Sequence, residues 1–469
     1  MTQAASATVP VTAQPSSFAR NWPFLALLAL SALLHFAWYQ RPLTVVLDEV
    51  YYPRFALDYL KHEYFFDLHP PLGKLIYFVT AWFAGLDPGF SFASNQLAFP
   101  DSSYLALRVP PRLAGTLLPL VLAGVALELG LSRTAALVIG ALATLDNALL
   151  VISRFALIDA FVLLFGFGAL WCYLHGRDRG WWWLIGTALL AGAAVSVKWT
   201  GLAFVGLVLI DEGARWLRAP KAAGFVRMAA IVLLGLTVYV ACFAAHFALA
   251  SRTGRDDGVM SQEFQSTLAG NPNAADRSLK RPGFLARFAE LHYRMFDGTR
   301  KSIAPHPYAS RWFEWPFMTR SLDFWAEHAD GKIAHIYVLG NPVVWWASTY
   351  CMLLLLVNFP PRLVNATLSQ PRQPLERIEV AVAVAYLANM LPFMPIARVL
   401  FAYHYLPALC VALIGLGYLL DRSGGYRKSL AIAVVALAVV GFVYIAPLTY
   451  GLPLEPGAFD ARFLVPGWR

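Results

Sequence analysis

Long apolar stretches, separated by short polar connections, form the dominant pattern of this sequence. A helix that crosses a bilayer needs about 20 predominantly apolar residues, and a set of segments approaches or reaches this length. These segments lie at residues 21–39, 108–129, 134–152, 158–175, 181–196, 199–211, 227–249, 338–358, 378–395, 399–420 and 428–448. The pattern predicts an all-α integral membrane protein with about eleven transmembrane helices.

The apolar segment Leu75–Leu86 is too short for a span. We therefore expect a juxtamembrane helix that lies at the interface. With this segment outside the membrane, basic residues of the short connections, such as Arg133, Arg218 and Arg422, gather on one side. Short cytoplasmic loops collect Lys and Arg, so the N-terminus is expected inside and the C-terminus outside.

This topology divides the chain into four parts. Residues 1–20 form a cytoplasmic tail, and residues 21–249 form a transmembrane module with an outer loop at 40–107. Residues 250–337 form a second outer loop, and residues 338–469 form the C-terminal transmembrane helices.

The second outer loop carries two recognisable patterns. Apolar residues near helical spacing, among them Phe288, Leu291 and Met295, predict an amphipathic helix. The aromatic run from Arg311 to Trp325 is typical of side chains that anchor a loop to lipid headgroups. Some of these rings could instead shape a groove for an acceptor or a lipid.

Composition supports the membrane assignment. The chain is 58% hydrophobic and 14% charged, with a net charge of +9. Basic cytoplasmic loops account for that charge, so we expect a lipid bilayer and no nucleic acid as partner. The four cysteines lie inside apolar segments without metal-ligand spacing, and we expect them to be buried thiols.

Titratable residues concentrate in the connection DEVYYPRFALDYLKHEYFFDLHPPLGK, from Asp48 to Lys74. Its two prolines and the helix that follows them hold side chains rigidly. A partly dehydrated carboxylate can accept a proton from a hydroxyl, and Asp48 is our candidate for this base. Glu49 could hold Asp48 in place, pair with an arginine or orient an acceptor. The alternative is an acidic pair that only neutralises Arg41 and Arg54.

The predicted topology also places several cations on the same outer side, at helix ends or inside apolar sequence. Buried cations of this kind are costly and mark functional sites or structural ion pairs, and both interpretations stay open for each. As functional groups they would stabilise negative charge on a phosphate. The candidates are His69, Lys74, Arg112, Arg154, Lys198, Arg398 and His404.

Further carboxylates on this side leave room for a metal ion. Asp159 and Asp67 are candidates for a second carboxylate beside Asp48. Together with Glu49 and His69 they could converge on a divalent ion. No HxxxH or CxxC spacing supports such a site. We therefore assign no metal ligands, and a divalent cofactor stays open.

Several motifs resemble those of the protein O-mannosyltransferases, and they follow one another in that family's order. The motifs are Asp48-Glu49, HPPLGK (His69–Lys74), RVPPRLAGTLLP (Arg108–Pro119), SRFALIDA (Ser153–Ala160), SVKWTGL (Ser196–Leu202), HPYASRWFEWP (His306–Pro316), LGNPVVWW (Leu339–Trp346) and RVLFAYHYLPAL (Arg398–Leu409). The resemblance implies the GT-C glycosyltransferase fold with an outer catalytic loop.

The resemblance also implies an activity: inverting transfer of mannose from polyprenyl-phosphate mannose to Ser/Thr hydroxyls of exported proteins. It implies that Asp48 is the base, that Glu49 helps to form the site, and that Arg112 assists on the donor side. Eukaryotic members carry a MIR domain in the second outer loop, and the loop here is too short for one. The chain therefore resembles the compact bacterial branch, which implies the inner membrane with the site facing the periplasm.

Three questions stay open at this point. The same chemistry could act on a lipid or glycan, as in the aminoarabinose transferases that modify lipid A. A transporter is disfavoured because the charges cluster at one face and no half-repeat is evident. Eukaryotic members form dimers, which leaves a homo-oligomer open, although the sequence shows no dimer face.

Overall fold

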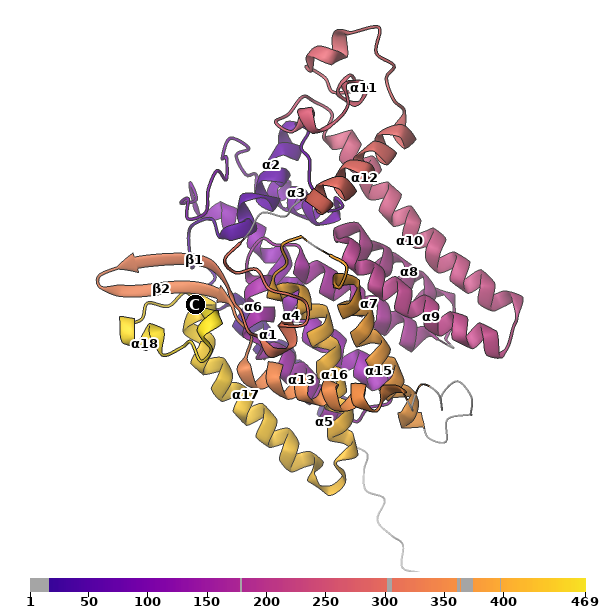
Figure 1. Ribbon diagram of the computed structural model, residues 1–469, viewed down its shortest axis with the longest axis vertical. Helices are drawn as coiled ribbons and strands as arrows, with labels where there is room; N and C mark the ends of the chain where they lie inside the picture. Colours follow the sequence, from indigo (N-terminus) through magenta and orange to yellow (C-terminus); the bar gives the residue numbers. More distant parts are fainter. Residues whose placement is uncertain (1–16, 178, 302–305, 361–362, 364–373, 397) are drawn as a thin grey trace, which may run out of the picture.

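The computed structural model describes most of the chain and is largely helical (Figure 1). It describes residues 17–469 apart from 178, 302–305, 361–362, 364–373 and 397. Most of the predicted N-terminal tail, residues 1–16, thus lies outside the described part.

Each predicted span coincides with a helix or a helix pair, which confirms the helical class. These elements are α1 (Ser17–Phe36), α4 (Val109–Glu128), α5 (Arg133–Thr144) with α6 (Asn147–Arg154), α7 (Asp159–Gly176), α8 (Trp181–Val197), α9 (Leu202–Arg218), α10 (Ala222–Leu249), α13 (Pro342–Val357), α15 (Pro374–Met390), α16 (Leu406–Arg422) and α17 (Arg427–Tyr450). Within the described residues, 5 helices are long and apolar enough to cross a bilayer alone, or 6 if α5 and α6 form one span. The protein is thus a multi-pass membrane protein, and the count of eleven crossings stays a prediction.

The segment predicted as a span at 134–152 is not one straight helix, because the chain breaks there into α5 and α6, which are bent by 58°. Asp146 causes the break. Its Oδ1 accepts the backbone N–H of Leu149 at 2.9 Å and so caps α6, while its Oδ2 accepts the N–H of Asn341 and the indole N–H of Trp345. The first backbone N–H groups of a new helix have no acceptor within that helix, and a carboxylate at the N-cap accepts hydrogen bonds from them. In a continuous helix, the carbonyl groups of the preceding turn would accept these bonds instead.

Shorter elements gather at one end of the helical body in Figure 1, beyond the end of α10. They are α2 (Tyr52–Lys61), α3 (Leu72–Ala84), α11 (Gln262–Gln265) and α12 (Phe284–Lys301). Helix α3 is short and exposes Trp82 and Phe83, as expected for an interfacial helix. Helix α12 confirms the predicted amphipathic helix. It buries Leu291 and Met295, and its Phe288 ring lies 5.1 Å from that of Phe243 in α10.

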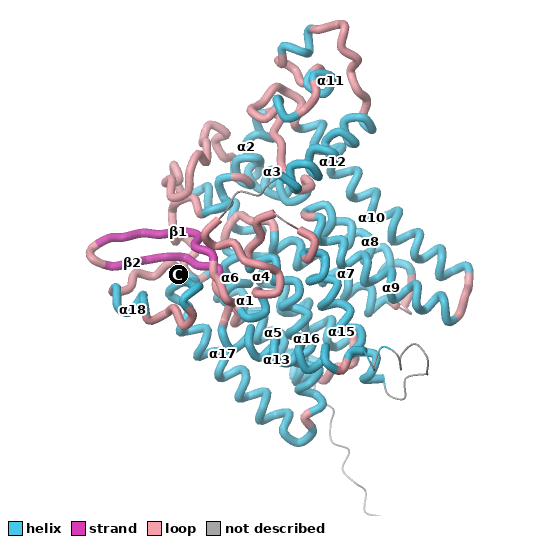
Figure 2. The backbone as a smooth tube through the Cα atoms, viewed as in Figure 1, coloured by secondary structure: helices cyan, strands magenta, loops and turns pink. Residues whose placement is uncertain are grey.

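A two-stranded antiparallel hairpin projects from the body beside the C-terminus (Figures 1 and 2). It consists of β1 (Leu322–Ala329) and β2 (Lys332–Val338), joined by Asp330 and Gly331, which both have positive φ. This hairpin was not predicted, because the aromatic run from Arg311 to Trp325 was interpreted as a set of interfacial anchors. An Asp-Gly pair between two alternating segments is itself a strong hairpin signal. Short helix α18 (Pro456–Asp460) packs below the hairpin.

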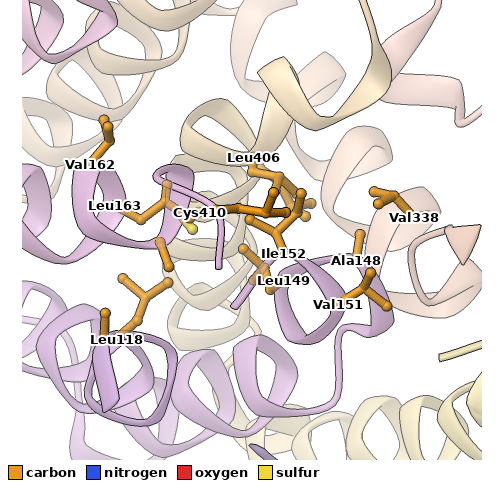
Figure 3. Close-up of a cluster of buried hydrophobic side chains, with 14 of the residues drawn as sticks. Leu118, Ala148, Leu149, Val151, Ile152, Val162, Leu163, Val338, Leu406 and Cys410 are labelled. Atoms are coloured by element: carbon orange, nitrogen blue, oxygen red, sulfur yellow. The ribbon is translucent and has the colours of Figure 1, made fainter. Parts of the chain in front are cut away.

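The buried core extends across the break between α5 and α6 (Figure 3). Ala148, Leu149 and Ile152 of α6 lie among side chains from α7, α16 and β2. Helix α6 is buried along its whole length, so its last residue, Arg154, is held away from solvent. The core thus fixes the segment 154–159 that leads into the site.

Candidate functional site

Asp48 lies in a short 3₁₀ turn, Leu47–Val50, at the start of the first polar connection. Its carboxylate accepts no hydrogen bond and forms no ion pair within the part of the chain that the structure describes. The pKa of Asp48 is raised to about 6, chiefly by burial and then by the carboxylates of Asp159 and Asp67, against the opposing effect of Lys198. An unpaired carboxylate with a raised pKa is suited to accept a proton near neutral pH.

Two lysine–carboxylate pairs lie next to Asp48. Lys198 Nζ is 2.9 Å from Asp159 Oδ1, and Lys74 Nζ is 2.5 Å from Asp67 Oδ2. Both lysines are almost fully buried. We call these four residues, together with Asp48, the cavity site. The geometry brings together residues that are up to 150 positions apart in the sequence, as the topology predicted.

The local sequence explains why these elements approach so closely. Gly73 follows the two prolines and opens α3, and a Cβ there would lie 2.6 Å from Ile158 Cγ2 and 3.6 Å from Val197 Cγ1. Ile158 and Val197 directly precede Asp159 and Lys198. Only glycine lets α3, with Lys74, pack onto both segments at this distance.

A cavity of about 430 Å³ opens beside Asp159 and Lys198. Polar groups from Asp159, Lys198, Tyr403 and His404 line one part, and mostly apolar side chains of α9, α15 and their neighbours line the rest. Lys198 Nζ lies 5.3 Å from the centroid of the Tyr403 ring, which stacks on His404. A cavity of this character suits an amphiphile with a charged head and an apolar tail.

His69 and Arg398 complete the surroundings of Asp48. Burial, together with Lys198, Lys74 and Arg398, holds the pKa of His69 well below its usual range, so its imidazole is neutral. The buried Nε of Arg398 has no hydrogen-bond partner among the described residues. Because a buried guanidinium N–H without an acceptor is costly, Arg398 is a candidate to bind an incoming anion next to Lys198 and His69.

Glu49 differs sharply from its neighbour Asp48, because its carboxylate is fully used inside the protein. Arg108 donates to Glu49 through Nε at 2.8 Å and Nη2 at 2.6 Å. The backbone N–H groups of Val46 and Ala156 donate to the same two oxygens at 3.0 Å and 2.9 Å. Of the roles expected for Glu49, the geometry favours pairing with an arginine and holding Asp48 in place over direct contact with substrate.

Arg112 and Arg154, expected among the phosphate ligands, lie in a different place. Arg112 donates to the carbonyl oxygens of Arg154 at 3.0 Å and His35 at 2.8 Å, and stacks on the Tyr39 ring. Arg154 donates to the carbonyl of Trp38 at 3.3 Å and lies 4.3 Å from the centroid of the Tyr450 ring. We call Arg108, Arg112 and Arg154 the arginine cluster. Its guanidinium groups contact Glu49, backbone carbonyls and aromatic rings, although Nε and Nη1 of Arg154 have no hydrogen-bond partner among the described residues. None of the three lines the cavity.

Three of the carboxylates considered as metal ligands instead form ion pairs with basic side chains. No group of three or more His, Cys, Asp or Glu side chains within the described ranges has the arrangement of a metal site. Asp67 and Asp159 each pair with an ammonium group. Glu49 faces Arg108.

Two residues that matter here were not singled out from the sequence as site residues. Tyr403 connects Lys198 to His404, and it stands in the quoted run YHYLP. Arg108 pairs with Glu49 across 59 positions, a contact that no local pattern signals. The free cysteines that the structure describes are buried or half-buried, as expected.

Comparison with known proteins identifies the family of this chain. Residues 25–251 match the family model "Dolichyl-phosphate-mannose-protein mannosyltransferase", and residues 284–468 match the "C-terminal four TMM region of protein-O-mannosyltransferase". Dolichyl-phosphate-mannose–protein mannosyltransferase 4 of Candida albicans is 30% identical over 54% of this chain and 37% of that protein. The match thus spans little more than a third of that relative's length.

Solved structures share the fold. The protein O-mannosyltransferase Pmt1–Pmt2 complex of Saccharomyces cerevisiae superposes with a TM-score of 0.88 at 17% identity, over 97% of this chain and 93% of that one. ArnT of Cupriavidus metallidurans gives a TM-score of 0.53 at 15% identity, over 91% and 65%. These likenesses confirm the predicted GT-C fold. With both family models matched in order along the sequence, the chain belongs to the protein O-mannosyltransferase family.

Proposed function

We propose that this protein transfers mannose from a polyprenyl-phosphate-linked donor to a Ser or Thr hydroxyl of a protein, with Asp48 as the general base. The observation that carries the proposal is the unpaired Asp48 carboxylate, whose pKa responds to Asp159 and Lys198, two residues that line the cavity. The family membership and the relatives' printed names support the choice of sugar and of donor class.

The donor would occupy the 430 Å³ cavity. The apolar part of its lining suits the first isoprenoid units, and the end at Lys198 and His404 suits the phosphate. Arg398, with its unpaired Nε, adds a donor for a phosphate oxygen. Positive charge at this point stabilises the leaving phosphate more than the intact donor, because negative charge grows as the sugar departs.

The reaction would be a single in-line displacement. The acceptor oxygen attacks the anomeric carbon and its proton passes to the Asp48 carboxylate. The bond from the anomeric carbon to the phosphate oxygen breaks, and its electron pair stays on the phosphate. The configuration inverts, and Asp48 returns its proton to solvent.

A second cavity supports a polypeptide acceptor. It measures about 740 Å³ and is lined by residues 38–44, Trp325 and Glu327. Thr44, which lines this cavity, is 4 positions from Asp48 in the sequence. Arg41 and Glu327 add one positive and one negative charge to the lining. Aromatic rings and mixed charges suit an extended peptide better than an acyl chain.

We infer a location in a bacterial inner membrane, with this end of the molecule facing the periplasm. The one-sided distribution of basic loops and the compact second outer loop support it. The yeast complex named above contains two different chains, which supports a search for oligomers of this protein.

The test is transfer of radiolabelled mannose from polyprenyl-phosphate mannose by purified wild type and Asp48→Asn, with protein and lipid acceptors assayed in parallel. We expect label in protein and a loss of about 10²-fold to 10⁴-fold in the variant. Exposed Asp87→Asn is the matched control and keeps the wild-type rate. Label that enters only lipid would overturn the protein acceptor, and an undiminished rate in Asp48→Asn would overturn the base.

A further inference from the structure

The hairpin brings two histidines together far from the donor cavity. His328 of β1 lies opposite Ile333 of β2, so His335, two positions further along β2, projects from the same face. The two Nε2 atoms are 3.3 Å apart, and the ring planes are inclined by 76°. His328 is exposed, so the space beside the pair is open to solvent.

A carboxylate fixes the orientation of the second ring. His335 Nδ1 lies 2.9 Å from Asp323 Oδ2, and a carboxylate can only accept a proton there. In the neutral imidazole, the proton of His335 is on Nδ1 facing Asp323, and its Nε2 presents a lone pair toward His328. A histidine whose second nitrogen donates to a carboxylate is the arrangement found behind metal-binding histidines.

The separation of the two nitrogens matches that of two ligands on one metal ion. Imidazole nitrogens lie about 2.0–2.1 Å from tetrahedral Zn²⁺, which places two of them about 3.3–3.4 Å from each other. We propose that His328 and His335 form a binding site for a Zn²⁺-class divalent cation, oriented by Asp323. Imidazole ligands favour Zn²⁺, Ni²⁺ and Cu²⁺ over Mg²⁺ and Ca²⁺.

Binding of the metal ion requires one tautomer of His328. When neutral His328 carries its proton on Nε2, that proton moves to Nδ1 by exchange with solvent, so that both Nε2 lone pairs point to the cation and both imidazoles stay neutral. With two side-chain ligands the remaining positions are filled by water. This agrees with the finding that no set of three metal-binding side chains occurs in the described part of the chain.

The position of the site gives it a mechanical consequence. Trp325 and Glu327 alternate with His328 along β1 and line the 740 Å³ cavity from the opposite face of the hairpin. A cation held by one residue from each strand ties β1 to β2 near the turn. It would therefore stiffen the wall of that cavity, independently of what the cavity binds.

The experiment is equilibrium dialysis of the purified full-length protein, without a polyhistidine tag, against ⁶⁵ZnCl₂, with excess Mg²⁺ present. We expect one site per chain that Mg²⁺ does not displace. His328→Asn lowers the affinity at least about tenfold, and Asp323→Asn lowers it roughly tenfold to hundredfold. Exposed His306, which lies outside the hairpin, supplies the control His306→Asn, with unchanged affinity.

A second measurement distinguishes a metal ion bound by both histidines from one bound by a single histidine. Cu²⁺ loaded at one equivalent should show coupling to two imidazole nitrogens in its paramagnetic resonance spectrum, and to one in His328→Asn. Because His328 is exposed, this substitution leaves the fold intact, which mannose transfer by the variant verifies. Equal Zn²⁺ affinity in His328→Asn and wild type, or coupling to a single nitrogen in wild type, would overturn the site.

Discussion

Two neighbouring groups of buried cations have opposite functions in this fold. In the cavity site, Lys74 and Lys198 each pair with one carboxylate and Lys198 lines a cavity. In the arginine cluster, the guanidinium groups contact Glu49, backbone carbonyls and aromatic rings, and none of them lines that cavity, although two nitrogens of Arg154 have no hydrogen-bond partner among the described residues. A buried cation near a membrane surface therefore indicates a binding site only when its charged group also lines a cavity, as that of Lys198 does.

The two adjacent acids show the same contrast at the scale of one residue. Asp48 has no partner among the described residues and a raised pKa, whereas four N–H groups fill the oxygens of Glu49. The arginine cluster therefore positions the turn that carries Asp48, and the cavity site is where we propose chemistry. The predictions that follow test this division.

The largest effect is expected in the arginine cluster, on stability. Arg108→Ala leaves the Glu49 carboxylate buried without its counter-ion, which costs about 3–5 kcal/mol of folding free energy. The matched control is Arg41→Ala, which removes an exposed pair with Glu327 and costs at most about 1 kcal/mol. Thermal unfolding in detergent measures both. Equal melting temperatures for the two variants would contradict a structural role for Arg108.

The second effect concerns the donor. Arg398→Ala removes a proposed phosphate ligand, and we expect kcat/KM for the donor to fall about 10²-fold to 10³-fold with the fold unchanged. Exposed Arg277→Ala serves as control, with an unaltered rate. A large loss of melting temperature in Arg398→Ala, with donor kinetics preserved, would place Arg398 with the structural arginines instead.

A third and smaller effect is expected from the close packing of α3. Gly73→Ala places a methyl group 2.6 Å from Ile158 Cγ2, and such overpacking costs about 1–3 kcal/mol. To relieve this contact, α3 must move away from Ile158, which displaces Lys74 relative to Asp159. Activity should therefore fall together with stability. Gly206→Ala, where a Cβ meets nothing within 4 Å, should be neutral or stabilising. Wild-type behaviour of Gly73→Ala in both assays would show that the glycine is dispensable.

The last prediction concerns pH. Since the pKa of Asp48 is raised to about 6, its carboxylate form is lost as the pH falls through 6. Transfer at saturating donor should therefore decrease about tenfold per pH unit below that value, because protonated Asp48 cannot accept the hydroxyl proton. The pH–rate profile of wild type measures this. A rate that stays constant from about pH 7 to 4.5 would exclude a base with such a pKa.

Much of this organisation could be predicted from the sequence, for identifiable reasons. Apolar length indicates where the helices lie, and the bias of basic residues places Asp48, Asp159 and Lys198 on one side of the membrane. The amphipathic helix α12 followed from its apolar spacing. These are properties of single segments, which a sequence displays directly.

Partnerships between distant residues could not be predicted in the same way. From the sequence, Arg112, Arg154 and Lys198 were equally good candidates for phosphate ligands on one side of the membrane. Only the packing of the helices shows that Lys198 lines the cavity and that the two arginines do not. Asp146 breaks a helix because Asn341 and Trp345, almost 200 positions away, use its second oxygen. The hairpin is the exception. Its Asp330-Gly331 turn was visible in the sequence and was overlooked in favour of the aromatic run.

The most direct test of the division between the two acids is a single-turnover experiment with radiolabelled donor already bound, comparing Asp48→Asn with Glu49→Gln. We predict that Asp48→Asn binds donor, melts at or above the wild-type temperature at pH 7, and fails to transfer, because a neutral amide removes both the base and the cost of a buried charge. Glu49→Gln should melt lower, yet transfer at an appreciable rate where it remains folded. Transfer by Asp48→Asn, with a stable but inactive Glu49→Gln, would contradict the account.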